Sequence, residues 1–320
     1  MPTLRPPVGG NEESKQKVAL KEQCTGHGSA AFSTLRGSTM PQLATRFAKN
    51  AHILRSDSPL GEEQMRLAAP SIFAAGKHES RSERYAYIPT IDVLRGLQKE
   101  GFQPFMVAQG KSRTAGKAEF TKHLIRMRYQ GDQTKGKPEA NEIVLINSHD
   151  GASSYSMMAG TFRFLCCNGM VVGDICSDIR IKHQGNAQNE VIEGAFRVLD
   201  EFETVEESVD EMKAITLTVD EQRVFATAAL ALRYGDRSEG QAPAPITAEQ
   251  LDSPRRMEDR GNSLWLSLQR TQENSTKGGL LGRSAQGRRL RTREVGSIDR
   301  SVSLNRALWV LAEEMKKLKG

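Results

Sequence analysis

The residues best suited to chemistry form a basic, glycine-containing segment in the last quarter of the chain. Between positions 277 and 293 there are six basic residues and no acidic residue: Lys277, Arg283, Arg288, Arg289, Arg291 and Arg293. Arginine offers paired N–H donors that match phosphate oxygens, and glycine lets backbone N–H groups approach a phosphate closely. The segment lacks the Gly-Lys-Ser/Thr ending of a nucleotide P-loop. It therefore predicts phosphate-backbone contacts, with a solvated basic loop as the alternative.

A second basic group comes from a predicted strand over residues 122–129. Period-2 alternation places Lys122, Arg126 and Arg128 on one face and apolar residues on the other. Only one face is expected to be core, so the three cations are predicted to face solvent and to contact phosphates. Aromatic residues near them in the chain, Tyr87 and Phe105 among others, would stack on unpaired bases if exposed and would be core if buried.

A metal-dependent enzyme is the second hypothesis. It would use His149 and Asp150, with His78 or His183 as further ligands. The spacing of the histidines and cysteines matches no compact zinc-ligand set. His123, on the apolar face of its strand, is expected to be a hydrogen-bonded core residue. The residues thus favour a protein without catalytic residues, bound metal or cofactor.

Charge is strongly segregated along the 320 residues. The net charge of +6 and the pI of about 9.1 favour polyanionic partners. Residues 76–130 carry a net +6 and residues 251–320 a net +7, whereas residues 190–221 carry a net −9. The acidic segment is expected to be a solvated helix face. A third hypothesis makes it the working surface of a protein-interaction or anti-host factor.

Several classes of protein are disfavoured by composition. No apolar run is long enough to cross a bilayer, and residues 1–36 do not read as a signal peptide. Four cysteines, two of them adjacent, do not form a disulfide framework. We therefore expect a cytoplasmic protein with no membrane partner, and a homo-oligomer is compatible with this composition.

The first half of the chain is expected to supply a sheet. A short helical stripe from Leu43 to Ile53 precedes it. Strands are predicted at 102–109, 122–129 and 142–147, the last buried on both faces, followed by a turn at 148–151. Two further strands, 161–165 and 170–172, flank Asn168-Gly169, a dipeptide typical of hairpin turns.

Helical periodicity begins after residue 187 and continues to the end. Thr218–Glu221 and Thr247–Gln250 have the spacing of helix-capping boxes. The predicted fold class is α+β, with an antiparallel sheet region followed by a mainly helical C-terminal half. The predicted organisation is a flexible extension at 1–39, an α+β core at 40–240 and a basic helical region at 241–320 packed on that core.

Many ordered motifs from about residue 40 onward resemble one family. They are Lys77-His-Glu-Ser-Arg-Ser-Glu-Arg-Tyr85, Tyr87-Ile-Pro-Thr90, Gly101-Phe-Gln-Pro104, Asn147-Ser-His-Asp-Gly151, Gly160, Phe162-Arg163, Cys167-Asn-Gly-Met170, Val191-Ile-Glu-Gly-Ala195, Pro254-Arg-Arg256, Asp259, Trp265, Gln272-Glu-Asn274, Lys277-Gly-Gly279 and Ala307-Leu-Trp309. This pattern resembles the domain of unknown function 932 family, the YafZ/YfjQ/YubP-like uncharacterised proteins of bacterial prophages and plasmids. The resemblance implies a bacterial cytoplasm and a mobile genetic element. It implies no reaction and no functional residues.

The residues and the resemblance together predict a non-enzymatic nucleic-acid-binding protein. Single-stranded DNA is the favoured partner, in the binding or annealing of strands during replication, recombination or maintenance of a mobile element. The metal-dependent enzyme and the protein-interaction factor remain the alternatives.

Overall fold

The structure is a computed structural model that describes residues 51–80, 87–112, 116–131, 137–165, 168–172, 179–181, 187–235 and 243–320. Gln42–Gly320 form one compact unit. The predicted extension at 1–39 and the predicted boundary near residue 240 both lie outside the described residues, so the division into domains stays a prediction.

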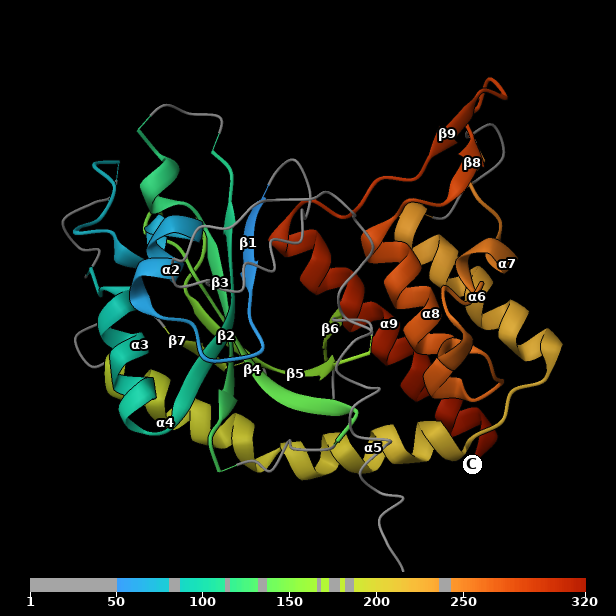
Figure 1. The fold of residues 1–320 in the computed structure, drawn as a ribbon, viewed down its shortest axis with the longest axis horizontal. Helices are drawn as coiled ribbons and strands as arrows, with labels where there is room; N and C mark the ends of the chain where they lie inside the picture. The colour runs from blue at the N-terminus through green and yellow to red at the C-terminus, as the bar shows by residue number, and fades with distance from the viewer. Residues whose placement is uncertain are drawn as a thin grey trace, which may run out of the picture. The chain divides into compact units, whose positions relative to one another are not determined.

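One antiparallel sheet dominates the first half of the described chain (Figure 1). Its strands are β1 (Ala51–Arg55), β2 (Phe102–Gly110), β3 (His123–Tyr129), β4 (Glu139–Asn147), β5 (Tyr155–Arg163), β6 (Asn168–Val171) and β7 (Ile179–Ile181). Strands β1 to β6 are neighbours in chain order, and β7 pairs with β5 beside β6. Because neighbouring strands are antiparallel, short turns suffice between several of them.

Helices make up most of the rest. They are α2 (Glu62–Ala68), α3 (Thr90–Lys99), α4 (Ala187–Asp200), α5 (Phe202–Ala214), α6 (Val219–Tyr234), α7 (Ala248–Leu251), α8 (Leu264–Lys277) and α9 (Ile298–Lys319), with 3-10 turns at Pro70–Phe73, Ala118–Phe120 and Met257–Asp259. The Thr218 and Thr247 hydroxyls accept backbone N–H groups at the starts of α6 and α7, as the capping boxes predicted. The predicted α+β class, with a sheet followed by helices, is confirmed.

Both faces of the sheet are buried. On one face Ile125 and Met127 of β3 join the main core with residues of α3, α4 and α5. On the other face Leu124 and Val144 form a smaller cluster with Ile298 at the start of α9. The expectation that β4 is buried on both faces is confirmed. The expectation that only one face of β3 is core is wrong, because α9 returns from the end of the chain to cover the other.

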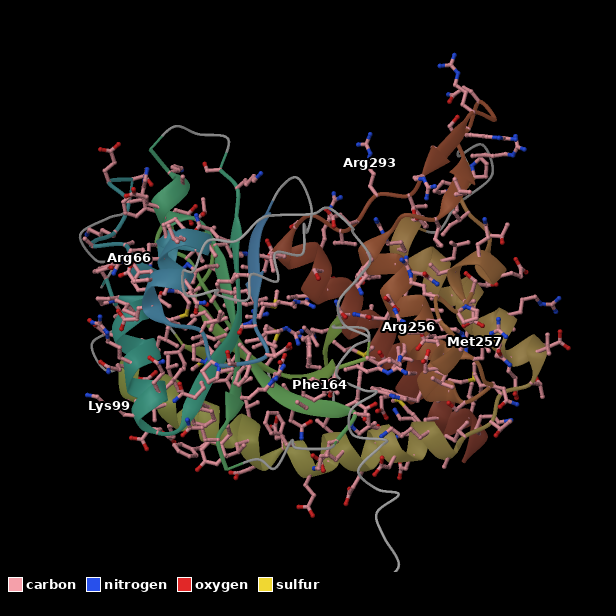
Figure 2. The ribbon with its side chains drawn as sticks, viewed as in Figure 1. Arg66, Lys99, Phe164, Arg256, Met257 and Arg293 are labelled. Atoms are coloured by element: carbon pink, nitrogen blue, oxygen red, sulfur yellow. The ribbon has the colours of Figure 1, made fainter. Side chains whose placement is uncertain are left out.

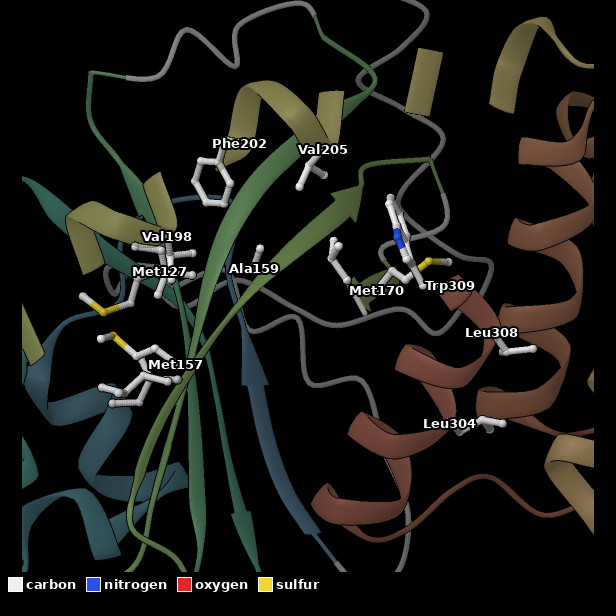
Figure 3. Close-up of a cluster of buried hydrophobic side chains, with 14 of the residues drawn as sticks. Met127, Met157, Ala159, Met170, Val198, Phe202, Val205, Leu304, Leu308 and Trp309 are labelled. Atoms are coloured by element: carbon white, nitrogen blue, oxygen red, sulfur yellow. The ribbon is translucent and has the colours of Figure 1, made fainter. Parts of the chain in front are cut away.

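The main core is continuous from the sheet into the C-terminal helices. Figure 3 shows Met170 of β6 beside Trp309 of α9, while Met157 of β5 lies among residues of the sheet and α4. Trp309 and Trp265 meet edge to face, with ring centroids 6.4 Å apart. The sheet and the C-terminal helices therefore share one hydrophobic core.

Two local predictions need correction. Asn168 and Gly169 lie within β6, opposite Arg163 and Phe162, so they are not the hairpin turn. A side chain at Gly169 would place its Cβ 2.2 Å from a guanidinium nitrogen of Arg126, so this glycine serves close packing and not a turn. Ile53 belongs to edge strand β1 and not to a helix, while the rest of that predicted stripe lies outside the described residues.

Candidate nucleic-acid interface

The basic segment after α8 folds into a two-stranded hairpin. Its strands are β8 (Leu281–Arg283) and β9 (Arg289–Arg291), paired antiparallel. Figure 1 shows the hairpin projecting beyond the ends of the helices that precede it. Since side chains alternate along a strand, Leu281 and Arg283 share a face with Arg289 and Arg291. All four are exposed, and three of them are cations.

The opposite face of the hairpin is fixed to the body of the protein. Gly282 passes so close to Pro245 that a Cβ there would lie 2.1 Å from the Pro245 carbonyl oxygen. The backbone N–H of Arg283 donates to that same oxygen at 2.8 Å, and the side chain of Gln250 in α7 donates to the Leu281 carbonyl at 2.9 Å. The arginine-bearing face is thus held in one orientation.

The glycines at the base close the hairpin. Gly278 has a φ of +61°, in the region that favours glycine, and a Cβ there would lie 2.6 Å from the Arg293 carbonyl carbon. The N–H of Gly279 donates to the Thr292 carbonyl at 2.9 Å. These glycines are therefore required by the backbone geometry of the hairpin, and the N–H of Gly279 is already hydrogen-bonded within the chain.

The hairpin arginines have no acidic partner among the described residues. No ion pair there involves Arg283, Arg288, Arg289, Arg291 or Arg293, and all five are exposed. Arg283 lies directly opposite Arg289 in the register, and like charges opposite one another in a ladder destabilise it. Figure 2 shows Arg293 pointing away from the ribbon just beyond β9. The surface concentrates positive charge without internal compensation.

Lys277, the sixth basic residue of this segment, is differently placed. Its Nζ lies 2.9 Å from Oε1 of Glu273 one turn earlier in α8. Burial alone would raise the pKa of Glu273, but hydrogen bonds from Arg256 and Lys277 outweigh it and lower the pKa. Lys277 is therefore committed to a partly buried ion-pair network inside the protein.

The three cations of β3 do not form an open face. Arg126 and Arg128 are 4% and 7% exposed, and both bind the carboxylate of Glu142, at 2.8 and 2.9 Å. Lys122 pairs with Asp299 at the start of α9, at 2.6 Å. The prediction that they face solvent is wrong for Arg126 and Arg128, since β6 packs against the guanidinium of Arg126 and the rings of Phe105 and Phe162 stack on that of Arg128.

The aromatic residues near β3 are also engaged within the fold. The guanidinium of Arg128 stacks 4.3 Å from the ring centre of Phe105. The ring of Tyr87 lies 5.1 Å from that of His149, and burial, with a smaller effect from Asp92, raises the pKa of Tyr87 to about 12. Neither ring is a free platform for stacking bases.

A buried polar cluster underlies the start of α3. The Thr90 hydroxyl lies 3.0 Å from Nε2 of His123 and 3.1 Å from Nε2 of His149, and it accepts hydrogen bonds from Asn147 and Tyr155. All five residues are fully or almost fully buried. The prediction that His123 is a hydrogen-bonded core residue is confirmed, and the cluster ties α3 to the sheet.

The residues named for the metal hypothesis are not gathered into a ligand set. Asp150 accepts from the backbone N–H of Ala152 at 2.9 Å, as in an Asx-turn. Nδ1 of His78 is hydrogen-bonded to the hydroxyl of Ser80 at 2.8 Å. His183 lies outside the described residues. In the part of the chain that the structure describes, no group of three histidine, cysteine or acidic side chains could hold a metal ion.

The acidic segment lies on α4, α5 and the start of α6. The acidic side chains of α4 and α5 alternate with buried apolar ones, and most are exposed. Figure 1 shows these two helices in line along one edge of the view. The arrangement matches the expected solvated helix face.

Two hollows beside the first half of α9 were not predicted from the sequence. One, of about 340 Å³, lies between α9 and strands β4, β5 and β7, and its walls include Arg180 and Arg306. The other, of about 600 Å³, lies between α9 and the end of α6, and its walls include Arg233 and Arg300. Asp299 lines both. The sequence contains only a weak indication of these hollows, because the four arginines in their walls come from three separate elements.

Comparison with known proteins places the chain in a family. No helix in the described part is long and apolar enough to cross a membrane, and no solved structure matches the chain. Two proteins of Escherichia coli (strain K12), UPF0380 protein YafZ and UPF0380 protein YfjQ, are each 49% identical over 276 residues, which is 86% of this chain and 98% of theirs. The family described as Domain of unknown function (DUF932) matches residues 77–309. The family match and the identity to these two proteins show that the chain belongs to the DUF932 family.

Proposed function

We propose that this protein binds nucleic acid, without catalysing a reaction, through the exposed arginine face of the β8–β9 hairpin. One observation carries the proposal. Arg283 and Arg289 lie opposite each other on a hairpin that Gly282 fixes to Pro245, and no described carboxylate compensates them. A phosphate backbone would relieve this repulsion and accept the paired N–H donors of arginine.

The geometry of the hairpin supports the same proposal. A two-stranded ribbon fits the major groove of a duplex and can equally lie along one strand. Arg288 in the turn and Arg293 beyond β9 extend the charge past both ends of the ladder. Arg126 and Arg128 are not part of the proposed interface, because both are buried and hydrogen-bonded to Glu142. Lys277 and Lys122 are paired with carboxylates and contribute only to the local electrostatic potential.

The experiment is fluorescence anisotropy with a labelled oligonucleotide and its duplex across a salt series. If five arginines each contact a phosphate of the duplex, log K should fall with log salt at a slope of about −4.5, a loss of about 500-fold between 50 and 200 mM salt. Replacing Arg283, Arg289 and Arg291 by alanine should make the slope shallower by about 3.

A matched control separates the hairpin from net charge. Arg197, Arg223 and Arg260 are exposed arginines on α4, α6 and the loop before α8. Replacing these three by alanine removes the same charge and should leave the slope within about one unit of the wild type. Equal losses in both variants, or no binding by the wild type at 50 mM salt, would refute the proposal.

The family match does not specify the biological process in which the protein acts, so that process is also a proposal. We infer a role in the replication, recombination or maintenance of a mobile element in the bacterial cytoplasm. The test is to isolate the tagged protein from cells carrying the element and sequence the bound nucleic acid. Enrichment of the element's replicating or recombining DNA supports this role, and uniform recovery of cellular nucleic acid contradicts it.

A further inference from the structure

A third hollow, of about 210 Å³, lies between α5, the start of β4 and the end of β5. Its described lining shares no residue with the proposed nucleic-acid interface. Figure 3 shows Val205 of α5 directed toward the sheet, and Val209, one turn later, lies on the same face of that helix. Val209 is buried and lines the hollow. The volume lies below the roughly 300–1,000 Å³ of ordinary small-molecule pockets, so the hollow fits a single side chain or a small, elongated molecule.

One buried hydroxyl group in this lining lacks a hydrogen-bond partner among the described residues. Thr161 is 4% exposed, and its Oγ1 is buried and unpaired. In the sheet register Thr161 lies directly opposite Asn141, so the two side chains share a face. The amide of Asn141 donates to Glu206 of α5 at 2.8 Å, which shows that this face looks toward α5 and the hollow. Because an unpaired buried hydroxyl costs free energy, a ligand that bonds to it would be favoured.

The lining holds further oxygen atoms that can accept hydrogen bonds. The Asn141 side chain donates its N–H₂ group to Glu206, which leaves its amide oxygen as an acceptor. Oδ1 of Asp210 accepts from Lys213 at 3.1 Å, and its other oxygen has no partner among the described residues. Together with Thr161 these residues present acceptors from β4, β5 and α5. An ammonium group, with three N–H donors and no acceptor, complements them.

The charges of the lining favour a cation. Nζ of Lys137 pairs with Glu206 at 3.2 Å. Nζ of Lys213 is shared between Glu139 at 3.3 Å and Asp210 at 3.1 Å. Three carboxylates against two ammonium groups leave one negative charge in the described lining. A ligand with one positive charge would neutralise it.

We infer that this hollow binds a primary alkylammonium group, with its N–H donors on Thr161, Asn141 and Asp210 and its methylene groups on Val209. An organic cation is favoured over a metal ion, because no three histidine, cysteine or acidic side chains in the described part of the chain could hold a metal. The end of a polyamine and the side chain of a lysine both carry this group. The inference goes beyond the proposed function and does not depend on it.

The test is isothermal titration calorimetry on the full-length protein at about 150 mM salt, where attraction between exposed charges is screened. Butylammonium represents the group itself. Tetramethylammonium, which has the same charge and no N–H donor, is its matched control. Butylammonium should saturate one site and bind about tenfold more tightly than tetramethylammonium, or better. Spermidine and a short peptide with one central lysine then distinguish the two sources, and the tighter ligand identifies the source.

Variants of the lining assign the binding to this hollow. Thr161→Val keeps the shape of the side chain and removes the hydroxyl. It should not lower the free energy of unfolding, since no hydrogen bond within the protein is lost, but it should weaken butylammonium binding about tenfold or more. Thr161→Ser should bind like the wild type. Asp210→Asn should weaken binding about two- to fivefold. Glu207→Gln, the same charge change at an exposed residue of α5 outside the hollow, should change it less than about twofold.

Three results would overturn the inference. The first is an unchanged affinity of Thr161→Val for butylammonium. The second is an equal loss in Asp210→Asn and Glu207→Gln, which would assign the binding to the net charge of α5 and would hold even if Thr161→Val failed to fold. The third is binding of tetramethylammonium as tight as that of butylammonium, or no saturable binding of butylammonium, spermidine or the lysine peptide by the wild type.

Discussion

Replacing Glu142 by glutamine should destabilise the fold far more than the loss of an ordinary ion pair. The side chain of Glu142 is 1% exposed, and its two oxygens accept from Arg126 at 2.8 Å and from Arg128 at 2.9 Å. An amide would keep one acceptor and turn an N–H₂ group toward a guanidinium. Two buried cations would then lack a counter-charge.

The size of the effect follows from these contacts. Each hydrogen bond to a charged group contributes about 1.5–3 kcal/mol, and breaking a buried ion pair from one side costs about 3–5 kcal/mol. We therefore expect the free energy of unfolding to fall by about 3–5 kcal/mol. Urea denaturation followed by circular dichroism measures it, with the slope of the transition checked for unchanged two-state behaviour.

Two further variants make this prediction specific. Glu206 also accepts from a lysine and an asparagine but is about half exposed, so Glu206→Gln should cost less than about 1 kcal/mol. Replacing Glu142 by leucine together with Arg126 and Arg128 by methionine should recover most of the loss, since apolar side chains of similar volume replace a buried ion network at little cost. A loss below 1 kcal/mol for Glu142→Gln would refute the assignment of these arginines to the interior.

Three other perturbations have expected outcomes. Thr90→Val should lower the free energy of unfolding by about 2 kcal/mol or more, because it removes a partner from several buried polar groups, and Thr90→Ser, which keeps the hydroxyl, should cost less when both are measured by urea denaturation. Gly282→Val should displace the hairpin from Pro245 and weaken nucleic-acid binding in the anisotropy assay, with little change in the melting temperature of the core; unchanged affinity would count against the hairpin interface. Glu221 has a lowered pKa, chiefly because the backbone N–H of Thr218 donates to it, so its stabilising effect is present above its unfolded-state pKa and is lost as pH falls through the folded-state pKa. Glu221→Gln should therefore lower the melting temperature at neutral pH and make no difference in strongly acidic buffer, and a pH-independent difference would contradict this origin.

Local pattern determined much of the fold. Alternation identified β3, because side chains on a strand point to opposite faces in turn. A short apolar run identified β4, because a strand buried on both faces is apolar at successive positions. The capping boxes at Thr218 and Thr247 located the starts of two helices, since those contacts join residues only three positions apart. The concentration of arginines from 283 to 293 was also visible in the sequence, because these residues lie close together in the chain.

Tertiary structure decided which of the basic residues are available to a partner. Arg126 and Arg128 follow the alternation of a solvent face, yet both are buried: the Met170 carbonyl of β6 accepts from Arg126, Phe105 and Phe162 stack on Arg128, and Glu142 neutralises both. Gly169 looked like a turn residue because local pattern cannot show that a guanidinium from another strand occupies the space beside it. The hollow at Arg180 and Arg306 exists only where β7 and α9 meet. The sequence by itself determined the elements and the excess of positive charge, whereas long-range packing determined which charges are compensated.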